Sequence, residues 1–144
     1  MKHRVVHWGT GNTGGPALRG VINHPDLELV GLLVHNPAKV GKDAGELCGI
    51  DPVGVEAIAD PDTLLAIDAD CLVYMGDYPL RPAEAIGDAC RFLQAGRNVV
   101  STSFLDWCIR RPLPRMFASR SNELAQWAAR RSFATAPTQV MPAT

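Results

Sequence analysis

The sequence has little of what marks a membrane protein, a metal centre or a disulfide-built extracellular domain. No apolar run approaches the length that crosses a bilayer, and no charged and then apolar leader precedes Val5. Its four cysteines have no metal-ligand spacing, and three of them lie in apolar surroundings. We therefore expect a cytoplasmic protein of one domain, with reduced, buried thiols and no membrane contact.

The two parts of the chain also have net charges of opposite sign. Residues 1–103 hold 8 Lys and Arg and 13 Asp and Glu, whereas residues 104–144 hold 6 Arg, no Lys and 2 acidic residues. The second segment is rich in Arg, Pro, Ser and Ala and has no strand period. This shift predicts a folded domain over residues 1–103 and an irregular or partly helical basic tail over residues 104–144.

The sequence of the basic tail predicts little regular secondary structure. One helix is predicted from Ser121, because Ser is a capping residue, and the composition beyond Phe133 is typical of disorder. Trp107, Trp127 and Phe133 are interpreted as an apolar patch that covers an edge of the sheet. Basic tails can bind nucleic-acid phosphates, but arginines mixed with prolines and without an aromatic ladder argue against nucleic acid here.

Glycine is placed where a nucleotide site needs it. The chain runs from the apolar segment Arg4–Trp8 directly into a G-x-G-x-x-G spacing. In such a turn the first glycine leaves the strand tightly, the second has no Cβ to obstruct a pyrophosphate, and the third lets the helix pack on the strand. The free N–H groups and the positive dipole end of that helix attract phosphate. The predicted phosphate site is Gly9, Thr10, Gly11, Asn12, Thr13 and Gly14.

The surroundings of this turn support a βαβ unit. Apolar residues recur with helical spacing from Ala17 to Ile22. After a break at His24–Asp26, residues 27–34 are almost continuously apolar, as in a strand buried on both faces of a parallel sheet. Strand, turn, helix and strand fit in about thirty residues, which is the size of one such unit.

Further strands and helices follow in alternation. Strands are predicted at Val53–Ala57, Cys71–Met75 and Asn98–Ser103, and helices at Pro61–Ala66 and from Pro82 to a left-handed cap at Gly96. Five strands alternating with helices predict an α/β, Rossmann-type fold with a doubly wound, mostly parallel sheet. The loops at the carboxyl ends of such strands converge on the ligand. We therefore add to the predicted dinucleotide site His35, Asn36, Lys39, Met75, Gly76, Asp77, Ser101 and Thr102.

The end of the second strand favours NADP(H) as the cofactor, with NAD(H) as the alternative. A NAD site usually has an acidic residue there, which holds the ribose 2′-hydroxyl. Here Val34 is followed by His35-Asn36-Pro37-Ala38-Lys39, and Glu28 lies at the wrong end of the strand. No carboxylate is placed to repel a 2′-phosphate, whereas Asn36 can donate a hydrogen bond and Lys39 can supply charge. A solvated loop lysine is the alternative interpretation of Lys39.

We expect the histidines to lie in different environments. His7 is interpreted as a core histidine with its polar atoms satisfied, and His24 as a surface turn residue. Only His35 is well placed for a ligand, and we expect it to contact adenine or ribose rather than to transfer a proton. No residue of the chain is predicted to be catalytic or to bind a metal.

These motifs resemble the amino-terminal NAD(P)-binding domain of the dihydrodipicolinate reductase superfamily, in particular its bacterial branch with 2,4-diaminopentanoate dehydrogenase-like proteins. The resemblance covers residues 3–103 and is most specific in the glycine turn, in HPDLELVG and in KVGKDAGEL. It implies an oxidoreductase that uses NAD(P)H or NAD(P)+ for hydride transfer at a C=N or amine carbon. It also implies pyrophosphate at Gly9–Gly14, the adenosine ribose after Val34, and nicotinamide near the loops after Met75 and Val100.

Members of this superfamily continue into a second domain that supplies the substrate pocket and the catalytic groups. Because the tail does not resemble that domain, we expect a truncated chain that needs a catalytic domain from elsewhere to act on a small amine or imine. Sheet edges that the second domain would cover predict self-association. The alternatives are a non-catalytic dinucleotide-binding remnant, and a module for coenzyme A or another nucleotide, since this turn can hold any pyrophosphate.

Overall fold

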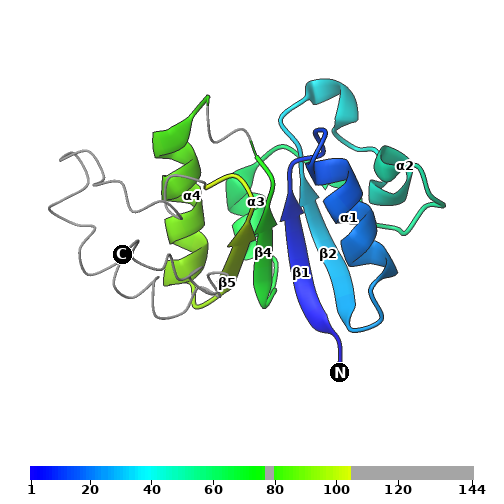
Figure 1. The fold of residues 1–144 in the computed structure, drawn as a ribbon, viewed down its shortest axis with the longest axis horizontal. Helices are drawn as coiled ribbons and strands as arrows, with labels where there is room; N and C mark the ends of the chain where they lie inside the picture. The colour runs from blue at the N-terminus through cyan, green and yellow to red at the C-terminus, as the bar shows by residue number, and fades with distance from the viewer. Residues whose placement is uncertain (77–79, 105–144) are drawn as a thin grey trace, which may run out of the picture.

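The structure is a computed structural model that describes residues 1–76 and 80–104, and it is an open sheet flanked by helices (Figure 1). The strands are β1 (His3–Trp8), β2 (Leu27–Leu33), β3 (Ala57–Ile58), β4 (Cys71–Tyr74) and β5 (Asn98–Ser101). The helices are α1 (Gly14–Asn23), α2 (Ala44–Cys48), α3 (Pro61–Ala66) and α4 (Pro82–Gln94), with a 3-10 turn η1 (Pro37–Lys39). All paired strands are parallel, in the order β3-β2-β1-β4-β5. The predicted Rossmann-type fold is confirmed.

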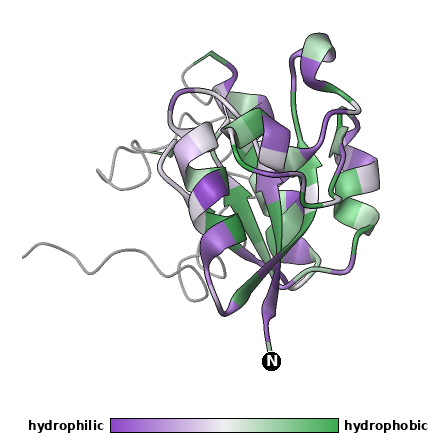
Figure 2. Cartoon of the chain, turned by 90° about the vertical axis from the view of Figure 1, so that its right-hand side faces the viewer, coloured by the Kyte–Doolittle hydropathy of each residue, from purple (hydrophilic) through white to green (hydrophobic). Residues whose placement is uncertain are grey.

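Two apolar layers hold the helices on opposite faces of the sheet. On one face Leu18 of α1 and Ala44 of α2 pack with Leu32 of β2. On the other face Leu64 of α3 and Phe92 of α4 pack against β1 and β4. Much of the central sheet is hydrophobic, while the helices carry polar residues outward (Figure 2). The winding of the chain reverses between β1 and β4, which is where sheets of this kind bind ligands.

Short caps mark the start of α3 and the end of α4. Asp60 accepts the N–H groups of Asp62 and Thr63 at the start of α3, and the predicted bounds of this helix are confirmed. Gly96, which follows the C-cap residue Ala95 of α4, has a φ of +80° and the predicted left-handed conformation. These local signals therefore set where two of the helices begin and end.

The third strand lies later than predicted. The expected strand was Val53–Ala57, but β3 is Ala57–Ile58. The carboxylate of Asp43 accepts the N–H groups of Val53 at 2.9 Å and Gly54 at 2.7 Å, so these groups are not available for strand pairing. Gly54 also has a φ of +81°, a left-handed conformation that interrupts an extended chain. The segment is a loop around a carboxylate rather than a strand.

The predicted ends of β4 and β5 are also too late. β4 ends at Tyr74 and β5 at Ser101. The Oγ of Ser101 accepts the N–H of Ser103 at 2.9 Å, which turns the chain out of the sheet. Phe104 then stacks on Tyr74, with ring centroids 5.1 Å apart. The core therefore includes Phe104, and the domain boundary after residue 103 stays a prediction.

The thiols are less buried than predicted. Cys48, Cys71 and Cys90 are free and only partly buried. Burial, helped by the nearby carboxylate of Asp70, raises the pKa of Cys71 to about 11, and burial also raises the pKa of Cys90. Both thiols therefore stay protonated and unreactive at neutral pH. Cys108 lies outside the described residues.

Several other predictions concern residues that the structure does not describe. They are the site residue Asp77, the helix from Ser121, the disorder beyond Phe133, and the apolar patch of Trp107, Trp127 and Phe133. Within the described ranges, no helix is long and apolar enough to span a bilayer. The same ranges hold no group of three or more His, Cys, Asp and Glu residues that could bind a metal ion. Self-association through a sheet edge stays a prediction.

Candidate functional site

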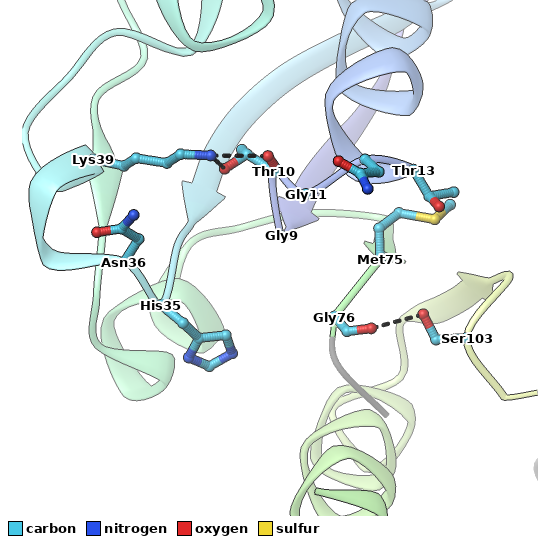
Figure 3. A pocket seen from close by; sticks show the side chains of 11 residues that line it. Gly9, Thr10, Gly11, Thr13, His35, Asn36, Lys39, Met75, Gly76 and Ser103 are labelled. Carbon is cyan, nitrogen blue, oxygen red and sulfur yellow. Dashed lines mark hydrogen bonds between the residues drawn. The ribbon is translucent and has the colours of Figure 1, made fainter. Parts of the chain in front are cut away.

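A cleft of about 400 Å³ lies at the carboxyl end of the sheet, where loops from distant parts of the sequence meet (Figure 3). These loops follow β1, β2, β4 and β5. The predicted convergence of loops therefore occurs at the switch point between β1 and β4. The lining residues are Gly9, Thr10, Gly11, Asn12, Thr13, His35, Asn36, Lys39, Met75, Gly76 and Ser103.

Most of the predicted site residues line this cleft, and three described ones do not. Gly14 is buried beneath the turn. Ser101 and Thr102 lie beside the cleft, where Thr102 Oγ1 donates to the sulfur of Met75 at 3.1 Å. Ser103 takes their place in the lining, and its Oγ donates to the carbonyl of Gly76 at 2.9 Å. The predicted site includes Ser101 and Thr102 of this segment but not Ser103.

The first and third glycines of the turn are required by the protein's own packing. Gly9 has a φ of +97°, and a Cβ there would lie 2.6 Å from the carbonyl oxygen of Met75. A Cβ at Gly14 would lie 2.2 Å from the carbonyl oxygen of Gly9. Real Cβ atoms do not come this close to another atom. The loops at the ends of β1 and β4 and the start of α1 can therefore approach this closely only with glycine at both positions.

The second glycine, Gly11, is not required by packing. A Cβ at Gly11 would meet no atom within 4 Å, its φ lies outside the left-handed region, and the residue is exposed. Among the described residues, no acceptor takes the backbone N–H groups of Gly11, Asn12 or Thr13. Thr13 also caps α1 without a side-chain hydrogen bond. The turn thus presents three consecutive free donors beside an open space, which is the arrangement that holds a phosphate.

His7 lies under the turn and is fully buried. Its Nε2 lies 2.9 Å from the carbonyl oxygen of Gly9 and 3.1 Å from that of Gly14. Burial lowers the pKa of His7 to about 4, although the two hydrogen bonds oppose this shift, so the ring is neutral at physiological pH. The predicted burial is confirmed, but within residues 1–76 and 80–104 only one of the two ring nitrogens has a partner.

The loop after β2 contacts the glycine turn through Lys39. Its Nζ donates to the carbonyl oxygen of Thr10 at 2.9 Å and to the Thr10 hydroxyl at 3.1 Å (Figure 3). Asn36 caps η1, because its Oδ1 accepts the N–H of Ala38 at 3.0 Å. This contact uses only the oxygen of the Asn36 side chain, so its amide N–H groups are available to a ligand. No described lining residue is acidic. The ammonium group of Lys39 is therefore held at the cleft rather than in open solvent.

His35 lines the cleft and contacts two residues that lie outside the lining and were not predicted, Trp8 and Arg81. The indole Nε1 of Trp8 donates to His35 Nε2 at 3.0 Å, and the Arg81 guanidinium lies 2.9 Å from the same nitrogen. Because both neighbours are donors, Nε2 acts as the acceptor. No local sequence pattern predicts these contacts, because Trp8 is the last residue of β1 and Arg81 is the residue before α4.

A family model decides the relationship of this chain to known proteins. The model described as "Dihydrodipicolinate reductase, N-terminus" matches residues 3–79, which is more than half of the chain. The chain belongs to this family. The resemblance seen in the sequence is thus confirmed at the level of the family, while the branch stays a prediction.

Individual relatives agree with this assignment. An amine dehydrogenase of Streptomyces virginiae is 44% identical over 114 residues, covering 78% of this chain and 32% of the relative. The solved amine dehydrogenase of Mycobacterium smegmatis has the same fold, with a TM-score of 0.70, 24% identity, and coverage of 92% of this chain and 38% of the other. The WlbA dehydrogenase of Bordetella pertussis, solved with NADH and UDP-GlcNAcA, gives a TM-score of 0.53 and 28% identity over 70% of this chain and 28% of its own. The chain spans about a third of the length of the amine dehydrogenases it matches.

Proposed function

We propose that this dihydrodipicolinate reductase-type domain binds a nicotinamide dinucleotide, with the pyrophosphate against the glycine turn. The observation that carries the proposal is the row of free N–H groups at Gly11, Asn12 and Thr13, next to a position where a Cβ would project into open space. Packing explains why residues 9 and 14 are glycine but not why residue 11 is. A ligand that approaches the backbone closely supplies that reason.

The two halves of the cleft suit the two halves of the cofactor. His35, Asn36 and Lys39 lie on one side of the turn, and Met75, Gly76 and Ser103 on the other (Figure 3). We place the adenosine ribose beside His35 and Lys39, where a cation and an amide donor can hold polar groups. The nicotinamide then lies near Met75 and Ser103, whose hydroxyl is oriented by the Gly76 carbonyl. A bound nicotinamide supplies the hydride donor or acceptor, and these residues of the chain bind and orient it.

The proposed reaction class is oxidation or reduction at an amine or imine carbon. It is supported by the family and by the amine dehydrogenase of Streptomyces virginiae, which is 44% identical over the matched residues. The binding of NADH by WlbA dehydrogenase supports a nicotinamide cofactor for this fold. Since the chain spans about a third of the amine dehydrogenases, the complete activity and its substrate rest on this proposal alone.

Titration of the full chain with NADPH, NADH and coenzyme A tests the cofactor class. We expect enhanced nicotinamide fluorescence with both reduced cofactors, and tighter binding of NADPH. Coenzyme A competes with NADPH only if the site accepts any pyrophosphate. Binding of coenzyme A without NADPH or NADH would replace the proposal with a coenzyme A module. Binding of none of the three would refute it.

Replacing Lys39 by alanine tests the preference for NADPH. The ammonium group is held at the cleft by Thr10, within the loop that we assign to the ribose. Loss of one partly exposed, charge-assisted contact to a 2′-phosphate is expected to weaken NADPH binding by about tenfold. NADH binding is expected to change by less than about threefold, because NADH has no 2′-phosphate. Dissociation constants of both cofactors, measured at low salt, give the comparison.

Lys42→Ala is the matched control, since Lys42 is an exposed lysine of the same loop that does not line the cleft. It is expected to leave both dissociation constants unchanged. Equal weakening of NADPH and NADH in the Lys39→Ala variant would assign the lysine to the pyrophosphate and remove the basis for an NADPH preference.

A further inference from the structure

A single buried side chain links the two ends of the glycine turn. The Nε2 atom of His7 lies within hydrogen-bond distance of the carbonyl oxygens of Gly9, the first glycine, and Gly14, the last. Carbonyl oxygens only accept hydrogen bonds, so Nε2 carries the ring proton and donates to both. The Nδ1 atom is then an unprotonated acceptor, and it is buried without a partner among the described residues.

The position of His7 explains why such a link is needed. The carbonyl of Gly9 points toward Gly14, because a Cβ on Gly14 would lie only 2.2 Å from its oxygen. This carbonyl belongs to the same peptide plane as the N–H of Thr10. In a trans peptide the two groups point in opposite directions, so a carbonyl held inward turns that N–H outward. A donor beneath the turn therefore favours the form in which the N–H of Thr10 faces away from the core, directly before the three free donors of residues 11–13.

We propose that His7 is a positioning residue of the phosphate-binding turn, which sets the affinity for the dinucleotide through its two carbonyl contacts without touching the ligand. This inference rests on the proposed function. An unpartnered buried Nδ1 has a cost in stability. A purely apolar residue would avoid that cost, and a hydrogen bond that shapes the binding turn gives a reason for histidine at this place.

Two substitutions separate the hydrogen bond from the side-chain volume. His7→Leu keeps an apolar volume but removes the donor. His7→Gln restores an N–H group close to the position of Nε2. We expect His7→Leu to weaken NADPH binding by about tenfold, and His7→Gln to bind within about threefold of the wild-type chain. The measurement is the dissociation constant of NADPH by nicotinamide fluorescence, at a temperature well below the melting temperature of each variant.

Val5→Ala is the control for a merely structural role. Val5 is a buried residue of the same strand and the same face as His7, but it does not reach the turn. Its truncation is expected to lower the melting temperature and to leave the NADPH dissociation constant unchanged. If His7→Leu does not fold, His7→Asn replaces it, because its shorter amide cannot reach the two carbonyls.

The outcomes distinguish this inference from the proposed function. Wild-type binding together with unchanged affinity in His7→Leu overturns the positioning role alone. Equal loss of affinity in Val5→Ala and His7→Leu, or failure of His7→Gln to restore binding, also overturns it. If the wild-type chain binds neither NADPH nor NADH, the proposed function fails and this inference fails with it.

Discussion

Gly11→Val is expected to weaken NADPH binding by at least about 100-fold while leaving the melting temperature of the free protein nearly unchanged. A Cβ at this position meets no atom of the described residues within 4 Å, and the backbone of Gly11 is not in the left-handed region. Folding therefore tolerates the change. The same side chain occupies the space that the pyrophosphate needs to reach the N–H groups of residues 11–13, so the contacts that hold the ligand are lost.

Gly20→Val provides the matched control for this substitution. Gly20 is exposed on α1, and a Cβ there also meets no atom within 4 Å, but the residue is remote from the cleft lining. We expect normal NADPH affinity in this variant. Retained affinity in Gly11→Val would show that the ligand does not approach the turn, and a large drop in its melting temperature would show that Gly11 is needed for folding instead.

The stability of the wild-type protein is expected to fall by about 3 kcal/mol between pH 7 and pH 4 through His7 alone. Burial lowers the pKa of His7 from 6.5 to about 4 in the folded protein. Between these two values the unfolded chain binds the proton and the folded protein does not. The stabilisation is therefore complete above pH 6.5 and is lost as the pH falls toward 4. Urea unfolding at a series of pH values measures this loss.

His7→Gln supplies the reference for the pH series, because glutamine does not titrate. Between pH 7 and pH 4 we expect the free energy of unfolding of this variant to fall by about 3 kcal/mol less than that of the wild-type protein. All other ionisable groups are common to both proteins, so their contributions cancel in the difference. Parallel curves would show that His7 binds a proton as readily in the folded protein as in the unfolded chain.

Local signals in the sequence predict the fold where neighbouring residues determine the structure. The almost continuously apolar residues 27–34 predict a strand, and β2 covers Leu27–Leu33 of them. The predicted helix at Pro61–Ala66 is α3, and Asp60 caps its start. The third strand could not be predicted in the same way. Hydrogen bonds to Asp43 keep Val53 and Gly54 out of the sheet, and this carboxylate lies ten and eleven residues earlier and reaches them only after folding.

The same distinction applies to the site. The glycine turn is a local motif, and the loops after β2 and β4 follow from the topology of a doubly wound sheet. The contact of Lys39 with Thr10, the donation from Trp8 to His35, and the link from His7 to Gly14 join residues that only the packed sheet brings together. Spacing predicts which loops meet, but not which side chains hold one another there.

The most direct test of the account is the response of the backbone amides to the cofactor in a ¹⁵N–¹H correlation spectrum of the full chain. We predict that addition of NADPH shifts the amide signals of Gly11, Asn12 and Thr13 more strongly than those of Gly20 and the rest of α1. Saturable binding that leaves these three signals in place, with the largest shifts elsewhere in the described domain, would contradict the central claim that the pyrophosphate is held by the glycine turn.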